Sequence, residues 1–332
     1  MKASGRKARA VATYVVVGGM ALIFLFDIAV TLLNNHNAKR YPVTQELFQG
    51  VSEGETRIHF LNTGNSDCIL LESRGRFALV DSGWGRDNPD TKAAAREGYE
   101  GRILDYLKRV AADESGAVTL DFVLPTHYHY DHAGGFALIL ADPAVRVNTV
   151  YLNPRDGQAS PYTLETRRRM EEVSRARGFA IEEELPAALA LGGMNLEFFN
   201  TAPSKYNENN KSIVTLITYG QFRGKSFRAL LAGDIYAPLE KTIAAEIGGP
   251  VDMLKLPHHG YSMSTSAAFL RALRPKLAVV TNDSAKIYPN VMWNLTLLSR
   301  TPALSPVNEN GLILTIGENG EILATGNLHL SE

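Results

Sequence analysis

Four residues that can bind a metal or move a proton lie within one short stretch of the chain, THYHYDHAGG. They are His127, His129, Asp131 and His132, and they include three of the chain's eight histidines. Residues two apart in an extended segment point to the same side, so His127 and His129 present their rings together, and Asp131 continues this spacing. His132 follows where the chain turns toward a helix. Imidazole and carboxylate groups together suit zinc, and also manganese or iron, so the stretch predicts a metal site.

Further residues of the same chemical types end other apolar strands. Asp81 lies in ALVDSG, Asp234 in LLAGDI, and His258 and His259 in LKLPHHG. A single aspartate at the end of a strand is often a turn or capping residue, and a histidine pair before glycine can be an ordinary loop. In layered α/β folds, however, ligands bind at the carboxyl ends of the strands. The repeated pattern predicts that these strand ends converge on the histidine stretch.

The elements that carry these residues alternate between runs of strands and single helices. Apolar stretches predict strands, and residues such as Ile103, Leu104 and Leu107 recur at helical intervals. The expected strands lie within 57–73, 75–85, 120–126, 147–153, 194–200, 212–220, 227–234, 251–257, 277–282 and 312–325, and the expected helices within 100–110, 132–142, 162–178 and 264–275. This order predicts sheets packed together with helices outside, a layered α/β sandwich.

Composition narrows the chemistry further. The chain has 332 residues, 34 Lys plus Arg and 35 Asp plus Glu, so its formal net charge of −1 does not require nucleic acid as a partner. Its single cysteine, Cys68, excludes an intramolecular disulfide and a cysteine-rich zinc site. A G-x-S-x-G nucleophile elbow and a Walker A loop are both missing from the sequence. Metal-assisted hydrolysis is therefore the expected reaction class.

The N-terminal residues differ from the rest of the chain. Residues 1–10 are basic, and residues 11–33 are apolar with a single charge, Asp27, which is costly in lipid. This stretch is long enough for a transmembrane signal anchor and longer than the apolar part of a cleaved signal peptide; a cleaved signal and a buried core helix remain alternatives. The flanking charges predict a cytoplasmic N-terminus and a single-pass protein of the cell membrane with its domain on the extracytoplasmic side. Residues 34–55 are expected to be a linker and residues 56–332 a hydrolase domain.

The motifs resemble those of a known family. HYHYDH is similar to the H-x-H-x-D-H motif of the metallo-β-lactamase superfamily, and LVDSG, LAGD and LPHHG follow in the order used there. HFLNTGNSDCILLES, NENNKSIVTL and KLPHHG resemble the hydrolase domain of ComEC-type DNA-uptake proteins, over roughly residues 56–328. The resemblance implies a four-layer αββα sandwich, here preceded by a single N-terminal transmembrane helix.

The resemblance also implies a set of ligands for two divalent metal ions. His127 and His129 would bind the first metal, Asp131 and His132 the second, and Asp234 would bridge them. Either His258 or His259 would complete the second site, and His258 is the preferred ligand.

Other matching positions imply supporting roles. Asp81 would orient a ligand imidazole through its other nitrogen. His259 would contact a metal ligand from outside the coordination sphere, or contact substrate. Asn209 and Ser212 would contact substrate or metal-bound water. Asp131 is also the expected catalytic residue, which orients the attacking water or accepts its proton.

The sequence departs from the superfamily pattern at one point, because it has no histidine between residues 133 and 257. The first metal would therefore lack a ligand that many members supply, and weak occupancy of this site is expected. Zinc remains the expected metal, with manganese as an alternative because it suits oxygen-rich shells.

The expected activity is that of a membrane-anchored hydrolase acting through a metal-activated water, with a phosphodiester as the favoured substrate. A lactone, a thioester or a cell-envelope choline phosphate would suit the same catalyst, and a non-catalytic anchored binding module is the alternative from another class. Nucleic acid remains open as a substrate. The basic residues are scattered, however, and TRRRMEEVSRAR is typical of a solvated helix face. The sequence gives no sign of a protein partner.

Overall fold

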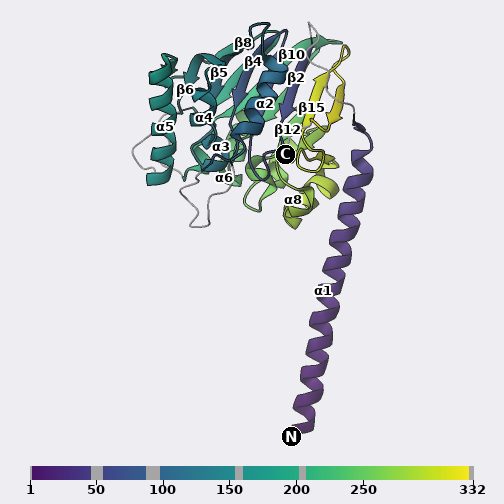
Figure 1. Ribbon diagram of the computed structural model, residues 1–332. Coiled ribbons are helices and arrows are strands. Elements are labelled where there is room, and N and C mark those ends of the chain that lie inside the picture. Colours follow the sequence, from purple (N-terminus) through teal and green to yellow (C-terminus); the bar gives the residue numbers. More distant parts are fainter. Residues whose placement is uncertain (1, 46–54, 87–97, 154–159, 202–206, 329–332) are drawn as a thin grey trace.

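The computed structural model describes residues 2–45, 55–86, 98–153, 160–201 and 207–328, with backbone only for 2–12, 14 and 15. Two sheets pack face to face, helices cover their outer faces, and one long helix projects from the lower end of the domain (Figure 1).

The larger sheet joins the first half of the domain to its last hairpin. Its strand order is β1-β16-β15-β2-β3-β4-β5-β6-β7. The pairs from β15 to β4 are antiparallel, whereas β4, β5, β6 and β7 run parallel. The bounds are β1 Val43–Thr44, β2 Thr56–Phe60, β3 Ile69–Ser73, β4 Arg76–Val80, β5 Val118–Leu124, β6 Val145–Tyr151, β7 Ala180–Glu182, β15 Leu312–Ile316 and β16 Ile322–Gly326.

The smaller sheet has the order β14-β13-β12-β11-β10-β9-β8. Its strands β11 to β14 run parallel and β8 to β11 antiparallel. The bounds are β8 Ala188–Leu191, β9 Met194–Phe199, β10 Val214–Phe222, β11 Lys225–Leu231, β12 Met253–Lys255, β13 Leu277–Val279 and β14 Ala303–Leu304. Each sheet thus has a block of parallel strands whose carboxyl ends share one edge.

The helices lie between these strands along the chain. The α-helices are α1 Lys2–Ala38, α2 Glu100–Ala111, α3 Tyr130–Ala133, α4 Phe136–Ala141, α5 Pro161–Arg177, α6 Ala237–Ile247, α7 Ala267–Leu273 and α8 Pro289–Trp293. Short 3₁₀ turns are η1 Asn209–Lys211, η2 Pro257–Gly260 and η3 Ser284–Lys286, and η4 Asn294–Ser299 is a π-helical turn. Ser160 begins α5 by accepting a hydrogen bond from the backbone N–H of Thr163, and left-handed Gly178 ends it.

Three apolar cores hold the layers together. One lies between the sheets and includes Ile58, Phe198 and Leu231. A second joins the outer face of the larger sheet to α2, α4 and α5, and a third joins the smaller sheet to α6, α7 and α8. Because both faces of the central strands are covered, they form nearly continuous apolar runs. The predicted four-layer αββα sandwich is confirmed.

The N-terminal segment forms one continuous helix, α1. Within the described chain, its residues Val16–Ala38 form a helix long and apolar enough to cross a membrane. The sequence predicts a linker over residues 34–55. In the structure, residues 34–38 continue α1, and β1 pairs in parallel with β16. Residues 46–54 of that linker lie outside the described chain.

Candidate metal centre

Residues from distant parts of the chain meet at the carboxyl edge of the two parallel blocks. Asp81 follows β4, the histidine stretch follows β5, Asp234 follows β11, and His259 follows β12. Because neighbouring parallel strands end at the same edge, these side chains are brought within contact of one another.

Four of these side chains face a common point. His132 Nε2 lies 3.1 Å from His259 Nε2 and 3.2 Å from Asp234 Oδ2. His259 Nε2 lies 3.5 Å from both Asp131 Oδ2 and Asp234 Oδ2. Two imidazoles and two carboxylates therefore direct ligand atoms toward the same small volume.

Hydrogen bonds on the far side of each imidazole fix its orientation. Asp81 Oδ2 lies 2.8 Å from His132 Nδ1, and Asp81 also accepts hydrogen bonds from the backbone N–H and hydroxyl of Thr126. Thr281 donates its single hydroxyl proton to Asp67 at 2.5 Å, so its oxygen accepts from His259 Nδ1 at 3.0 Å. Both rings thus carry a proton on Nδ1 and turn Nε2 toward the shared point, the arrangement found for metal-binding histidines.

Two buried residues absent from the sequence prediction complete the arrangement. Asp67 lies 3.3 Å from His259 Nδ1 and 3.7 Å from His132 Nδ1, and it forms an ion pair with Lys255. Lys255 also donates to the backbone carbonyl of Gly233. Asp67, His132, Asp234 and His259 are close enough to form one metal-binding group. Because Asp67 approaches the Nδ1 side of both rings, its position is that of a residue that orients the imidazoles.

His127 and His129 form a second pair beside this group. His127 Nε2 lies 3.1 Å from His129 Nδ1, and the His127 and His132 ring centroids are 4.2 Å apart. The Ser212 hydroxyl lies 3.3 Å from His127 Nδ1 and accepts the backbone N–H of Asp234. Ser212 therefore holds two predicted ligands in place, and the structure shows it in this role rather than toward solvent.

The structure reverses the expected positions of the two adjacent histidines. His259 enters the group, whereas His258 packs between Tyr236 and Tyr261, with ring centroids 5.1 and 5.2 Å away. Both histidines have left-handed backbone angles, with φ of 52° and 50°, which are uncommon outside glycine. This turn sends neighbouring side chains in different directions. The preference for His258 at this position is therefore corrected to His259.

The local sequence explains how the histidine stretch is presented. Tyr128 lies between two site residues and is fully buried in the core against the larger sheet, as alternation in an extended segment predicts. The extended part ends at His129, because α3 begins at Tyr130, so Asp131 reaches the site from a helix rather than by continuing the alternation. Gly135 permits the next turn, since a Cβ there would lie 2.4 Å from the carbonyl oxygen of Ser82.

The electrostatics of the group favour a bound cation. Burial opposes protonation of His132, but Asp234, Asp81 and Asp67 raise its pKa to about 10. The pKa of His259 is likewise raised well above its usual value, against burial, by Asp234 and Asp67. Yet two Nε2 atoms 3.1 Å apart cannot both carry a proton without a close N–H to H–N contact. The carboxylates therefore attract more positive charge than the two rings can hold in this geometry.

The residues present fit a divalent metal ion. Two nitrogen ligands at tetrahedral zinc lie about 3.3 Å apart, close to the 3.1 Å between His132 Nε2 and His259 Nε2. Among the described residues, Asp234 Oδ1 is buried without a hydrogen-bond partner, and the nearest cation is Lys255 Nζ at 3.8 Å. One divalent ion would supply the positive charge that the two rings cannot hold as protons on both Nε2 atoms.

Access to the group is limited to a few side chains. The Asp131 side chain is 19% exposed, whereas those of His132, Asp234 and His259 are at most 2% exposed. His129 and His258 are also partly exposed. Asn209 is buried and donates to Tyr236 Oη, and its Oδ1 lacks a hydrogen-bond partner. Asp131, His129 and His258 are therefore side chains of this region that solvent can reach.

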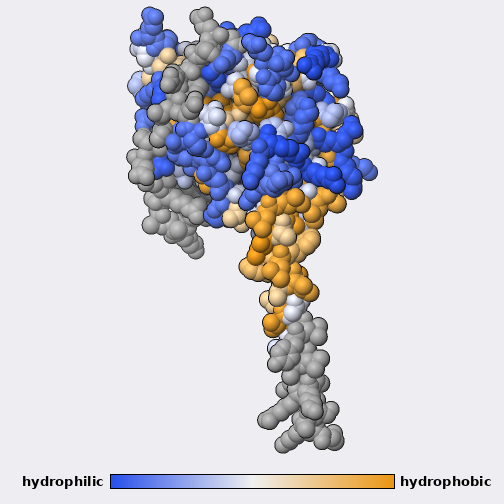
Figure 2. All heavy atoms as spheres, turned by 90° about the vertical axis from the view of Figure 1, so that its right-hand side faces the viewer, coloured by the Kyte–Doolittle hydropathy of each residue, from blue (hydrophilic) through white to orange (hydrophobic). Residues whose placement is uncertain are grey.

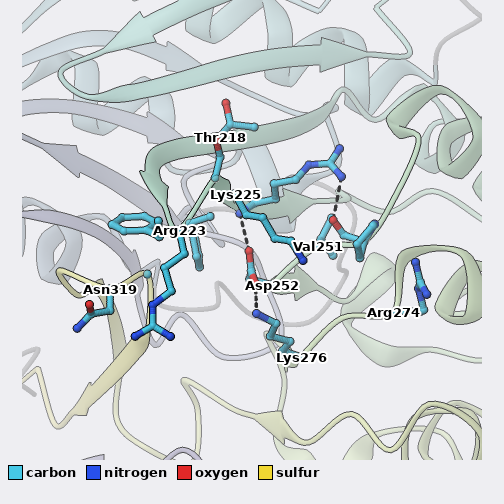
Figure 3. Close-up of a pocket in the computed structure, with 14 residues that line it drawn as sticks. Thr218, Arg223, Lys225, Val251, Asp252, Arg274, Lys276 and Asn319 are labelled. Carbon is cyan, nitrogen blue, oxygen red and sulfur yellow. Dashed lines mark hydrogen bonds and ion pairs between the residues drawn. The ribbon is translucent and has the colours of Figure 1, made fainter.

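A cavity of about 810 Å³ lies at the opposite edge of the smaller sheet (Figure 3). It is rich in cationic side chains, among them Arg223, Lys225 and Arg274, and it contains an ion pair between Lys276 and Asp252 at 2.6 Å. Asp252 precedes β12, whereas His259 follows it. The cavity and the metal centre therefore lie at opposite ends of β12.

The sequence model of the metallo-β-lactamase superfamily matches residues 61–197, which hold the histidine stretch, Asp67 and Asp81. The chain contains a metallo-β-lactamase domain. This fold is one of metal-dependent hydrolases, and the His and Asp cluster at its strand ends is compatible with a divalent metal.

Curated relatives confirm the predicted resemblance to ComEC-type competence proteins. The chain is 25% identical to Competence protein ComA of Neisseria gonorrhoeae, over 72% of this chain and 29% of that protein. Identity to ComE operon protein 3 of Bacillus subtilis is 23%, over 78% of this chain and 34% of that protein. The chain thus spans about a third of the length of these relatives. The solved metallo-β-lactamase fold protein YhfI of Bacillus subtilis gives a TM-score of 0.49 at 11% identity, covering 81% of this chain and 99% of that one.

Proposed function

We propose that the chain is a membrane-anchored metal-dependent hydrolase that cleaves a phosphodiester with an activated water. The carrying observation is the convergence of His132, His259, Asp234 and Asp131 on one point, with each imidazole held by oxygen atoms at Nδ1. The proposal includes two divalent ions, zinc in the first place and manganese as the alternative. The first metal of the sequence prediction, beside His127 and His129, would bind more weakly because the chain supplies few ligands there.

The residues divide the work of such a site. A bound divalent ion supplies Lewis acidity and lowers the pKa of water. Asp234 directs one oxygen toward the two histidines, and its other oxygen, 3.8 Å from Lys255 Nζ, has no hydrogen bond among the described residues, so it would be the residue that bridges two ions. Asp131 is the partly exposed carboxylate of the group, so it can orient the attacking water and accept its proton. His129 and His258 line the approach, where they can contact the substrate.

The anchoring part of the proposal depends on α1. Its apolar residues are exposed over most of their surface and are long enough to cross a bilayer. The basic residues before them favour a cytoplasmic N-terminus, which leaves the metal centre on the extracytoplasmic side of the cell membrane. The competence relatives support nucleic acid as one phosphodiester to test.

The test uses the full chain purified in detergent. Metal content is measured first, and hydrolysis of bis-p-nitrophenyl phosphate is then compared between the parent, Asp131→Ala and Asp113→Ala, the last being an aspartate on a surface turn. We expect stoichiometric metal, phosphodiesterase activity in the parent and control, and loss of activity in Asp131→Ala.

Two other outcomes decide between the alternatives. Cleavage of thioesters, lactones or phosphocholine with no cleavage of bis-p-nitrophenyl phosphate would replace the proposed bond. An Asp131→Ala variant as active as the parent would contradict the catalytic proposal, and metal binding without any hydrolysis would favour a binding module.

A further inference from the structure

The domain packs against the second half of the apolar stretch of α1. The rings of Phe26 and Trp293 meet edge to face, with centroids 5.4 Å apart, and Trp293 Nε1–H donates to Asp27 Oδ1 at 3.0 Å. Val30 is only 2% exposed, and Asn34 Oδ1 accepts the backbone N–H of Ala303. From Phe26 to Asn34, therefore, α1 belongs to the packed domain as well as to the expected membrane span.

This docking leaves too little free helix to cross a bilayer. Residues 11–25 are about 15 residues, or about 23 Å of helix at 1.5 Å each, whereas the hydrocarbon core of a bilayer is about 30 Å thick. If the domain stayed entirely in water, the free helix would be too short by several ångströms. If residues 11–33 lie in the bilayer, the parts of the domain beside Phe26 and Asp27 enter it too.

The domain surface beside α1 is suited to lipid. α1 contacts α8 and η4, and η4 exposes Leu297 and Leu298 by 42% and 55%. On α1 itself, Leu32 and Leu33 remain exposed by 63% and 41%. Figure 2 shows hydrophobic surface beginning where α1 meets the lower end of the domain and continuing down the helix, below a mainly hydrophilic domain.

The polar residues at this junction match an interface between lipid and water. Asp27 is the only charge within 11–33 and accepts a hydrogen bond from Trp293, a residue type favoured at membrane interfaces. Beyond the leucines lie the exposed cations Lys39, Arg40 and Arg300, with Arg40 donating to the carbonyl of Arg300. These cations would stand at the level of the lipid phosphates.

We propose that α8 and η4, together with α1 residues 26–34, form a membrane seat that lies in the interfacial layer of the bilayer. Interfacial elements typically bury their apolar face by about 5–10 Å, which covers the missing length of helix. The proposal rests on the membrane anchoring proposed above, but not on the catalytic activity.

The membrane seat also determines where substrate is met. The Tyr288 ring, just before α8, lies 5.4 Å from the Tyr261 ring, which lies 5.2 Å from that of His258. Aromatic side chains therefore connect the seat to the opening of the metal centre. In Figure 1, α3, α6 and α8 lie toward the end of the domain from which α1 projects. The metal centre would thus work at the membrane surface, on substrates held at or delivered to it.

The test measures the depth of Trp293 in the full chain reconstituted into phosphatidylcholine nanodiscs. The chain has two tryptophans, so a Trp84→Phe background isolates Trp293. Lipids brominated near the headgroup end of the acyl chain should quench Trp293 strongly, and lipids brominated near the methyl end should quench it weakly. Absence of quenching by either lipid would overturn the proposal.

Matched leucine pairs provide the control. Leu297→Glu with Leu298→Glu should remove most of the quenching, because two carboxylates oppose entry into lipid. Leu164→Glu with Leu323→Glu alters leucines of nearly equal exposure, 43% and 54% against 42% and 55%, on α5 and β16, and should leave quenching unchanged. Equal quenching of Trp293 in the two double variants would also overturn the proposal. The same holds if Trp293 is shielded from lipid because two chains associate in one disc. Sedimentation of the full chain with vesicles checks the anchor separately.

Discussion

Two buried groups of histidine and carboxylate lie in this domain, one in the core of the larger sheet and one at the metal centre. In the first, His59 Nδ1 lies 2.7 Å from Tyr106 Oη, and His59 Nε2 lies 2.8 Å from Glu72 Oε2. Arg57 bonds to the same glutamate at 3.0 Å. The second consists of the imidazoles and carboxylates around His132 and His259. Both groups are almost fully buried, and both contain residues that can bind metals.

The difference lies in how their polar atoms are paired. Each ring nitrogen of His59 faces an oxygen, and burial lowers the pKa of this histidine, so the core group is complete with a neutral ring. At the metal centre, two Nε2 atoms face each other, and within the part of the chain that the structure describes Asp234 Oδ1 has no hydrogen bond, with Lys255 Nζ 3.8 Å away. The types of residue therefore do not distinguish a structural group from a candidate metal site. The distinguishing feature is a set of ligand atoms that point to one place and lack hydrogen-bond partners of their own.

The largest expected effect is the loss of activity in Asp234→Asn. The amide keeps the size of the side chain but removes a charge that faces both Nε2 atoms, so metal should be lost. We expect hydrolysis to fall by about 1000-fold, equivalent to several kcal/mol of lost stabilisation. The metal-free protein should lose only the part of its stability that comes from the charge of Asp234 facing the protonated His132. Metal content, rate and denaturation curves test this, and a variant with full metal and a rate within tenfold of the parent would contradict it.

The opposite pattern is expected for Glu72→Gln in the core group. Removing the charge leaves Arg57 with the more exposed Glu55 as its carboxylate partner, which should lower the free energy of unfolding by about 1–3 kcal/mol. Metal content per folded molecule should stay unchanged, because Glu72 contacts the His59 group. Glu318→Gln, in the exposed turn between β15 and β16, serves as the control. If Glu72→Gln lost metal while keeping its stability, the distinction between the two groups would fail.

The stability of the metal-free protein should depend on pH through the histidines of the metal centre. In the metal-free protein the pKa of His132 is raised to about 10, above the value of about 6.5 in an unfolded chain. The stabilisation from the protonated ring is therefore fully present below pH 6.5 and is lost as the pH rises toward 10. Stability of the metal-free chain should fall by up to a few kcal/mol over this range.

Thermal unfolding of chelator-treated protein at several pH values measures this fall. His132→Gln should make the fall smaller, because glutamine does not titrate and only the raised pKa of His259 remains. Added metal should reverse the trend, since metal binding competes with protons for the same nitrogens. A metal-free parent that gains stability between pH 6.5 and 10 would contradict the charge balance inferred for the centre.

A smaller effect is expected for Asp81→Asn, which changes the orientation of one ligand without removing it. Asp81 has a left-handed backbone, with φ of 57°, which asparagine adopts easily. The variant loses the carboxylate that holds His132 Nδ1–H, and such changes typically weaken metal binding 10–100-fold. Chelator competition measures the affinity, with Asp252→Asn at the opposite edge of the smaller sheet as the control. An unchanged metal affinity in Asp81→Asn would contradict the proposed role of this aspartate in orienting His132.

The sequence was most informative where a pattern was local. Apolar runs predicted the strands, and the polar residues at their ends predicted that Asp81, the histidine stretch and Asp234 lie close together, because parallel strands bring their carboxyl ends to one edge. Two short elements beside α1, α8 and η4, were not predicted. They are only five and six residues long, too short for a helical period to appear.

Other features depend on contacts between distant residues. Asp67 follows turn residues in GNSDC and shows no local pattern; only its contacts with Lys255 and Thr281 reveal it. Lys255 lies inside the apolar strand VDMLKL, and a charged residue in a buried strand is the one signal that could have identified it. The choice between His258 and His259 depends on two left-handed residues, which the packing of the turn imposes.

The smallest effect on metal binding is expected where the sequence and the structure differ, at His258. His258→Phe should retain metal within about threefold of the parent affinity, less than the tenfold that 1.4 kcal/mol represents, because the ring packs with Tyr236 and Tyr261 and phenylalanine can keep that packing. His259→Phe, the matched change one residue later, removes a nitrogen 3.1 Å from His132 Nε2 and should lose metal. Both variants place the same side chain at a left-handed position, so backbone strain affects them alike and the comparison isolates the ligand. Metal loss in His258→Phe with retention in His259→Phe would restore the assignment suggested by the motif and would require the turn to rotate when metal binds.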